Sequence, residues 1–149
     1  MAGKYFEELT VGEEFLSPVR TITEADVAAF CGLCGLHNPL FIDEEFARHT
    51  PFGGTVAPAP LIVSYAIGLG DYLYHGTSVA VLSWNEIRFI KPVKPGDTIM
   101  LKTRVRNKRE SSSQPDAGIV ELDQEVVNQR REAVCTFGRT LMILKRPGR

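Results

Sequence analysis

The sequence predicts an α+β fold in which one central helix packs against an antiparallel β-sheet. Two observations support this prediction. The segment Pro60–Leu73 is apolar on nearly every face, and four long strand-like runs follow it in quick succession. A helix without a polar face belongs inside a protein. Long strands joined by short connections form antiparallel sheets, so the helix and the strands belong to one layered domain.

The length and composition are those of one folded domain. The chain has 149 residues, 44% of them hydrophobic, and a formal net charge of −1. A chain of this length buries roughly 68–70% of the surface that its unfolded form exposes. Its apolar content is too high for a disordered protein. We expect a single domain over residues 1–149, because no repeat, low-complexity tract or linker divides the chain.

Charge, hydropathy and cysteine usage limit the class of partner. A near-neutral balance argues against general nucleic-acid binding, which needs a cationic surface. No uncharged apolar run reaches the ~18 residues of a membrane span, and the first residues lack the apolar core of a secretory signal. Three cysteines do not suit a disulfide framework. We expect a cytoplasmic protein without nucleic-acid or membrane partners.

The N-terminal half is predicted to contain one strand and two helices. Phe15–Ile22 forms the first strand. Thr23 is a suitable N-cap for a helix that ends at Gly35. A second, short helix covers Asp43–Thr50, with Asp43 as its cap and a proline immediately after it.

The C-terminal half is predicted to contain the central helix and the remaining strands. Pro60 suits the first turn of that helix, and Gly76 is placed to end it. A turn rich in proline and glycine separates the first two strands that follow, and a polar loop covers residues 110–117. The four strands are expected at Val79–Phe89, Ile99–Lys108, Gly118–Asn128 and Ala133–Leu144.

Charged residues alternate along two neighbouring strands of the predicted sheet. A period of two places basic side chains on one face of the first strand and acidic side chains on one face of the next. A phosphate-binding stripe for coenzyme A and cross-strand ion pairing are both possible, and pairing explains the pattern adequately. The residues are Lys102, Arg104, Arg106 and Lys108 on one strand, and Glu121, Asp123 and Glu125 on the other.

The cysteines and two of the histidines favour structural roles. Cys31 and Cys34 have CxxC spacing, but no strand precedes them and no second pair completes a zinc tetrahedron. We expect both to pack in the core, as we do for Cys135, and we expect no metal site. His49 and His75 lie near predicted helix C-termini, where the helix dipole favours a cation.

One long stretch of the chain, TITEADVAAFCGLCGLHNPLFIDEEFARHTPFGG, resembles the MaoC-like hydratase/dehydratase family. Ile87–Asp97 (IRFIKPVKPGD) is similar to a later strand and turn of that family. The resemblance implies the hotdog fold, in which an antiparallel sheet wraps a long central helix, here Pro60–Leu73. The matching family positions are Thr23, Asp26, Phe30, Gly35, Asn38, Pro39, Asp43, Phe46, Ala47, Phe52, Gly53, Gly54 and Ala57.

The resemblance also implies a chemistry, the hydration of an enoyl thioester or the dehydration of a 3-hydroxyacyl thioester. Family members use an Asp directly after the motif glycine and a His five residues later, together with backbone N–H donors at a helix N-terminus. Those two positions are Leu36 and Phe41 in this chain, and neither side chain can exchange a proton. The family's second His and its glycine correspond to Pro58 and Ala59. The Ala59 N–H is the remaining candidate oxyanion donor.

His37 is the candidate for a displaced catalytic base. It lies one residue from the family's Asp position, and an unperturbed histidine pKa of ~6.5 suits acid–base work. A neighbouring residue in an extended loop generally points elsewhere, so the alternative is that His37 takes no part. The resemblance gives the candidate substrate-binding residues as Leu36, Asn38, Phe41, Gly54 and Ala59.

Three functions are compatible with this pattern. The favoured one is an acyl-CoA or acyl-ACP binding protein whose standard chemistry is lost or depends on a partner subunit. The second is an active enoyl-CoA hydratase or dehydratase that uses His37 as its base. The third is a hotdog thioesterase, which no motif supports. We expect a homodimer, or a hetero-oligomer with another hotdog protein, and no cofactor.

Overall fold

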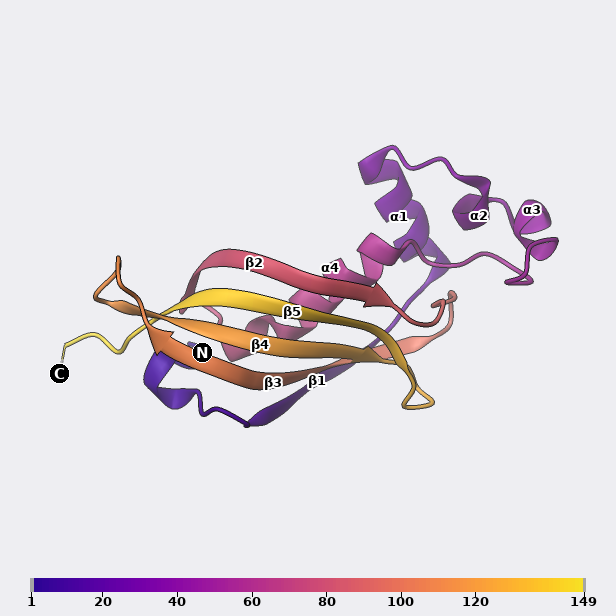
Figure 1. The fold of residues 1–149 in the computed structure, drawn as a ribbon. Helices are drawn as coiled ribbons and strands as arrows, with labels where there is room; N and C mark the ends of the chain where they lie inside the picture. The colour runs from indigo at the N-terminus through magenta and orange to yellow at the C-terminus, as the bar shows by residue number, and fades with distance from the viewer. Residues whose placement is uncertain (1, 149) are drawn as a thin grey trace.

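The computed structural model describes residues 2–148, which form a five-stranded antiparallel sheet with a helix against one face (Figure 1). The strand order is β1-β3-β4-β5-β2, and every neighbouring pair is antiparallel. The expected α+β fold is confirmed, and the strand bounds differ from those expected by a few residues at most. The strands are β1 (Glu14–Thr21), β2 (Ser78–Phe89), β3 (Thr98–Glu110), β4 (Ala117–Val127) and β5 (Ala133–Leu144).

The helices divide into a central one and a group outside the sheet. The central helix, α4 (Ala59–Gly70), runs along one face of the sheet (Figure 1). Three helices form an overhang, residues 24–48, which projects beyond the sheet at the end where α4 begins (Figure 1). No helix among residues 2–148 is long and apolar enough to cross a membrane. The overhang comprises α1 (Glu24–Cys34), α2 (Pro39–Ile42) and α3 (Glu44–Arg48), and the 3₁₀ turns are η1 (Phe6–Glu8) and η2 (Asp71–Leu73).

Helix α1 begins with the cap that the sequence predicts. The Thr23 hydroxyl accepts a hydrogen bond from the Asp26 N–H at 3.1 Å, and the Asp26 carboxylate accepts one from the Thr23 N–H at 2.9 Å. This reciprocal arrangement satisfies N–H groups that a helix start otherwise leaves without acceptors. At the other end, Gly35 adopts a left-handed conformation with φ of 68°, which glycine takes without strain.

Helix α4 lies inside the protein over most of its surface, as expected, and exposes one narrow stripe. It packs against β1 and β3, and its buried residues are Leu61, Ile62, Val63, Ala66 and Gly70. Ser64 and Gly68 are exposed because no element covers this stripe of the helix. The helix also ends earlier than expected: η2 follows Gly70, and Gly76 lies beyond it. A Cβ on Gly70 would lie 2.8 Å from Leu101 Cδ2, so any side chain at this position would displace Leu101.

Lys108 does not share a face with the other basic residues of β3, contrary to expectation. A β-bulge between Val105 and Asn107 shifts the pairing with β4, and the extra residue reverses the alternation of side chains beyond it. The Lys108 ammonium therefore reaches the inner side, where it donates to the carbonyls of Phe6 and Leu9 at 2.8 and 2.7 Å.

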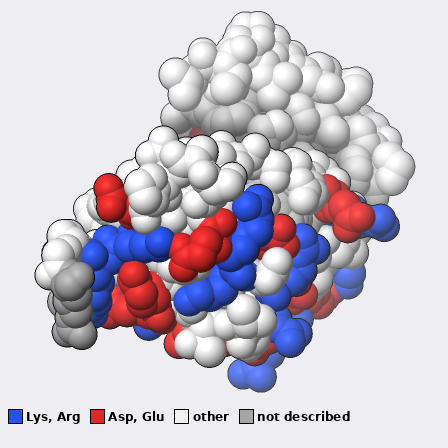
Figure 2. All heavy atoms as spheres, turned by 60° about the vertical axis from the view of Figure 1, so that its left-hand side comes forward, with Lys and Arg blue, Asp and Glu red and all other residues white. Residues whose placement is uncertain are grey.

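Two of the remaining basic residues on this face, Lys102 and Arg106, pair across the strands as expected. Lys102 lies 4.0 Å from Glu125, and Arg106 lies 3.3 Å from Glu121. Figure 2 shows basic and acidic side chains interspersed over the surface. Exposed pairs of this kind contribute on the order of 0–1 kcal/mol each, so they stabilise the sheet modestly and leave no continuous cationic stripe.

The expected burial is confirmed for Cys31 and Cys135 and is wrong for Cys34. Cys34 is the last residue of α1, where the helix extends past the core that contacts Val27 and Cys31. Burial raises the pKa of the Cys31 thiol and raises that of Cys135 to about 11. All three thiols are free, and no group of His, Cys, Asp and Glu within the described residues could hold a metal ion.

Replacing Thr23 by alanine should lower the free energy of unfolding by about 1 kcal/mol, the usual contribution of an N-cap side chain. Chemical denaturation of Thr23→Ala measures this loss, and Thr23→Ser, which keeps the hydroxyl, should unfold like the wild type. The Thr23 N–H bond also lowers the pKa of Asp26. The stability that this hydrogen bond to the Asp26 carboxylate contributes is therefore present at neutral pH and lost as the pH falls through that lowered pKa. Equal stability of the alanine and serine variants would contradict the capping role.

Candidate functional site

An apolar cavity of about 380 Å³ lies between the overhang and the end of the sheet. Its walls come from α2, the loop before α4, the first turn of α4, the end of β2, the turn after it, and the start of β5. Lys91 is its one charged lining residue. The lining consists of Phe41, Phe52, Val56, Ala57, Ala59, Ile62, Phe89, Ile90, Lys91, Pro92, Val93 and Val134.

The start of α4 contributes a single free donor beside this cavity. Pro58 provides no side-chain cap, and Pro60 has no N–H. The N–H groups of Leu61 and Ile62 both donate to the Pro58 carbonyl. Within the described residues the Ala59 N–H has no acceptor, so it adds to the partial positive charge of the helix N-terminus.

Phe41 and Ala59 are the predicted substrate-binding residues that the structure brings together at the cavity. Leu36, in the overhang, is half-buried and packs against the core outside the lining of the cavity. The exposed Asn38 caps α2, since its side-chain oxygen accepts from the Leu40 N–H at 3.0 Å. Gly54 is buried, and its missing Cβ would lie 3.0 Å from a carboxylate oxygen of Glu44.

His37, the predicted displaced base, is exposed and is not among the residues that line the cavity. His37 lies in a short non-helical segment, as expected, and a helical turn begins two residues later at Pro39. Asn38 caps that turn, and Pro39 occupies its first position, where proline is favoured. This turn carries Phe41 to the cavity. The other histidines pair with acidic side chains: His49 lies 3.3 Å from Glu45 and His75 lies 2.6 Å from Asp71.

A second hollow, of about 490 Å³, lies on the outer face of the sheet. It is larger, but it contains none of the predicted site residues. Four basic side chains and four acidic side chains line it, so their charges balance and favour neither anions nor cations. These are Arg88, Lys102, Arg104 and Arg106, with Glu14, Glu86, Asp123 and Glu125. The cavity beside the overhang is therefore the better candidate for a ligand site.

Sequence reasoning missed the part of the cavity that β2 and the following turn supply. Phe89, Ile90 and Lys91 lie thirty or more residues from the predicted site residues in the chain and meet them only through the fold. The similarity of Ile87–Asp97 to a family strand and turn marked this segment as important without giving its place. Glu44 was also missed: its carboxylate accepts from the Thr55 N–H at 3.2 Å and holds the loop before α4.

A family model described as MaoC like domain matches residues 7–128. Among curated relatives, mesaconyl-CoA hydratase of Cereibacter sphaeroides is 31% identical over 148 residues, which is 97% of this chain and 42% of that protein. The chain spans 31% to 42% of the length of the first three curated relatives that it matches.

Solved structures show the same fold. A MaoC-like dehydratase from Rhodospirillum rubrum is 29% identical, with a TM-score of 0.87 over 98% of this chain and 100% of its own. A Mycobacterium tuberculosis protein with a double hotdog fold is 26% identical, with a TM-score of 0.88 over 99% of this chain and 46% of its own. This chain therefore corresponds to one hotdog unit.

Proposed function

The chain belongs to the MaoC-like dehydratase family of hotdog proteins, and from that premise we propose that it binds an acyl or enoyl thioester in the cavity beside the overhang. The observation that carries the proposal is an apolar cavity of about 380 Å³ with one free backbone donor, the Ala59 N–H, at its wall. Ligand sites are typically ~300–1,000 Å³, mostly apolar, with few polar groups. An acyl thioester has this character, with one carbonyl oxygen on an apolar chain.

The proposed binding mode follows from the positions of these groups. The acyl chain lies against Phe41, Ile62 and Val134, and the thioester carbonyl accepts a hydrogen bond from the Ala59 N–H. The carrier, coenzyme A or acyl carrier protein, extends from the open side of the cavity. The name of the Cereibacter relative, a hydratase of a coenzyme A thioester, supports this ligand class.

We further propose that hydratase chemistry is lost, or depends on a partner subunit. The two positions at which the family resemblance places the acid–base pair hold Leu36 and Phe41. Lys91 is the one charged residue of the lining, and its ammonium forms an ion pair with Glu132. The exposed position of His37 outside the lining favours this proposal over a displaced base.

The proposed assembly is a homodimer, or a pair with another hotdog protein, joined along β2. This edge strand exposes apolar side chains, whereas β1 at the other edge contains Pro18, a residue that protects an edge because it cannot donate a ladder hydrogen bond. The double hotdog of the Mycobacterium protein supports pairing of two such units. The proposed location is the cytoplasm, because the three free thiols fit a reducing compartment. The exposed large apolar residues of β2 are Val79, Val81, Leu82, Trp84, Ile87 and Phe89.

Calorimetry with a series of acyl-CoA analogues should detect binding. Ile90 lines the cavity and is 53% exposed, and Val11 is 54% exposed outside it. Ile90→Glu should weaken binding by about tenfold or more, because a charge in an apolar site must be desolvated. The matched control Val11→Glu should bind like the wild type. Absence of wild-type binding at millimolar ligand would overturn the proposed site.

Light scattering should give a mass of at least twice 16.5 kDa for the wild type. Leu82 on β2 is 47% exposed and Val19 on β1 is 66% exposed. Leu82→Lys should shift the protein toward the monomer, because lysine opposes pairing at a sheet edge, while Val19→Lys should not. A wild-type monomer across micromolar concentrations would count against pairing along β2.

The isolated protein should hydrate a short enoyl-CoA far more slowly than the ~10⁴–10⁸ M⁻¹s⁻¹ usual for kcat/KM. Positioned acid–base groups typically contribute ~10²–10⁴-fold, and both expected groups are absent. His37→Ala should leave the residual rate unchanged, and Leu36→Asp combined with Phe41→His should raise it. An ordinary wild-type rate that collapses in His37→Ala would instead establish an active hydratase with a displaced base.

A further inference from the structure

We propose that Asp97 and Gln129 are a positioning pair that fixes the turn forming one wall of the cavity and, through it, the entry to α4. Neither residue lines the cavity. The pair acts through the backbone of the turn, residues 93–97. The proposal rests on the proposed function for its ligand, although its structural part can be tested without one.

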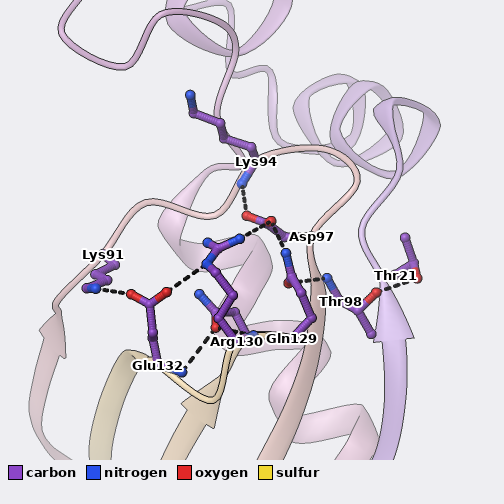
Figure 3. Close-up of polar contacts among 9 residues, drawn as sticks. Thr21, Lys91, Lys94, Asp97, Thr98, Gln129, Arg130 and Glu132 are labelled. Atoms are coloured by element: carbon purple, nitrogen blue, oxygen red, sulfur yellow. Dashed lines mark hydrogen bonds and ion pairs between the residues drawn. The ribbon is translucent and has the colours of Figure 1, made fainter.

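The side chains of the pair join the turn to the β4–β5 hairpin (Figure 3). One oxygen of the Asp97 carboxylate accepts from the Lys94 N–H at 2.9 Å, and the other accepts from the Gln129 side-chain amide at 2.8 Å. The side-chain carbonyl oxygen of Gln129 accepts a hydrogen bond from the Thr98 N–H at 3.0 Å. One carboxylate thus closes the turn and ties it to the neighbouring hairpin.

This turn, residues 93–97, also holds the segment that leads into α4. The Val93 carbonyl accepts from the Ala57 N–H at 2.7 Å, and both residues are buried and line the cavity. The Lys94 ammonium donates to the carbonyl of Phe52, another lining residue. Ala57 lies two residues before Ala59, the proposed oxyanion donor. A shift of the turn therefore moves two cavity walls and the approach to that donor.

The environment of the Asp97 carboxylate strengthens its bonds. Its side chain is 15% exposed, and Arg130 lies 3.9 Å away. Arg130 also pairs with Glu132 at 2.6 Å, and Glu132 pairs with Lys91 at the cavity (Figure 3). Hydrogen bonds that are accepted by a charged group are stronger than those between neutral groups.

The same pair is not required to hold the sheet together. The β3, β4 and β5 strands are joined by long backbone ladders that begin beside the pair and do not use its side chains. The backbone bonds between Ile22 and the turn, from Ile22 N–H to Asp97 O and from Gly96 N–H to Ile22 O, also remain without it. Loss of the pair should therefore disturb the cavity before it unfolds the domain.

A charge-swapped double variant tests the pair by calorimetry with an acyl-CoA analogue that the wild type binds. In Asp97→Asn one of the two carboxylate oxygens becomes an NH2 group, so either the Lys94 N–H or the Gln129 amide faces a donor and loses its acceptor. Affinity should fall about tenfold, as for loss of one charge-assisted hydrogen bond. In Gln129→Glu two carboxylates face one another, and affinity should fall similarly. Combining both changes restores a donor opposite an acceptor and should recover most of the wild-type affinity.

The matched control is Asp123→Asn, which removes an exposed carboxylate 3.9 Å from Arg106 on the outer sheet face and should bind like the wild type. Thermal unfolding confirms that each variant is folded at the temperature of the titration. Unchanged affinity in folded Asp97→Asn, or a double variant that binds no better than Asp97→Asn, would overturn the proposal.

Hydrogen exchange of the Ala57 amide provides the readout that needs no ligand. The Val93 carbonyl protects the Ala57 amide from exchange only while the turn is fixed. Asp97→Asn should therefore accelerate exchange at this amide, and the double variant should slow the exchange again. If the wild type binds no acyl-CoA, the proposed function fails and this exchange alone decides on the pair. Unchanged exchange in Asp97→Asn would then overturn it.

Discussion

A mismatch in length between the central helix and the sheet governs the rest of the structure. Helix α4 has 12 residues and β3 has 13, but a helix rises about 1.5 Å per residue and a strand about 3.3 Å. The helix is therefore about 18 Å long against a strand of about 43 Å. One helix of this length cannot cover the inner face, so other elements must cover the two ends and one side.

Different segments cover the two ends. At one end, η1 inserts Phe6 into a second apolar cluster, so closely that a Cβ on Gly118 would lie 2.2 Å from the Phe6 ring. At the other, the overhang packs Phe30, Leu36 and Phe41 against the first cluster. The first closure is tight, whereas the second leaves the apolar cavity beside the start of α4. The inner side of β2 is left without a helix, which accounts for its exposed apolar residues.

Features that depend on local sequence were predictable, and those that depend on tertiary register were not. The strands, the α1 cap and the Asp43 cap of α3 follow from patterns within a few residues. The bulge before Asn107 does not, because an extra residue in one strand leaves no mark on the alternation that precedes it. Likewise, Phe41 and Ala59 were found as site residues from their motif, whereas Phe89 and Ile90 enter the cavity only because β2 ends beside α4.

The family motif, in this chain, serves architecture. Asn38 caps α2 and Asp43 caps α3, Gly35 ends α1 in a left-handed conformation, and Asp97 closes a turn. None of these roles involves proton transfer, and each shapes the overhang or the wall of the cavity. The two motif positions at which the resemblance places proton chemistry are the ones that hold Leu36 and Phe41, and both side chains pack against the core. The residues that match the family therefore build the overhang and the wall of the cavity, and the proposal that hydratase chemistry is lost rests on the two positions of Leu36 and Phe41 alone.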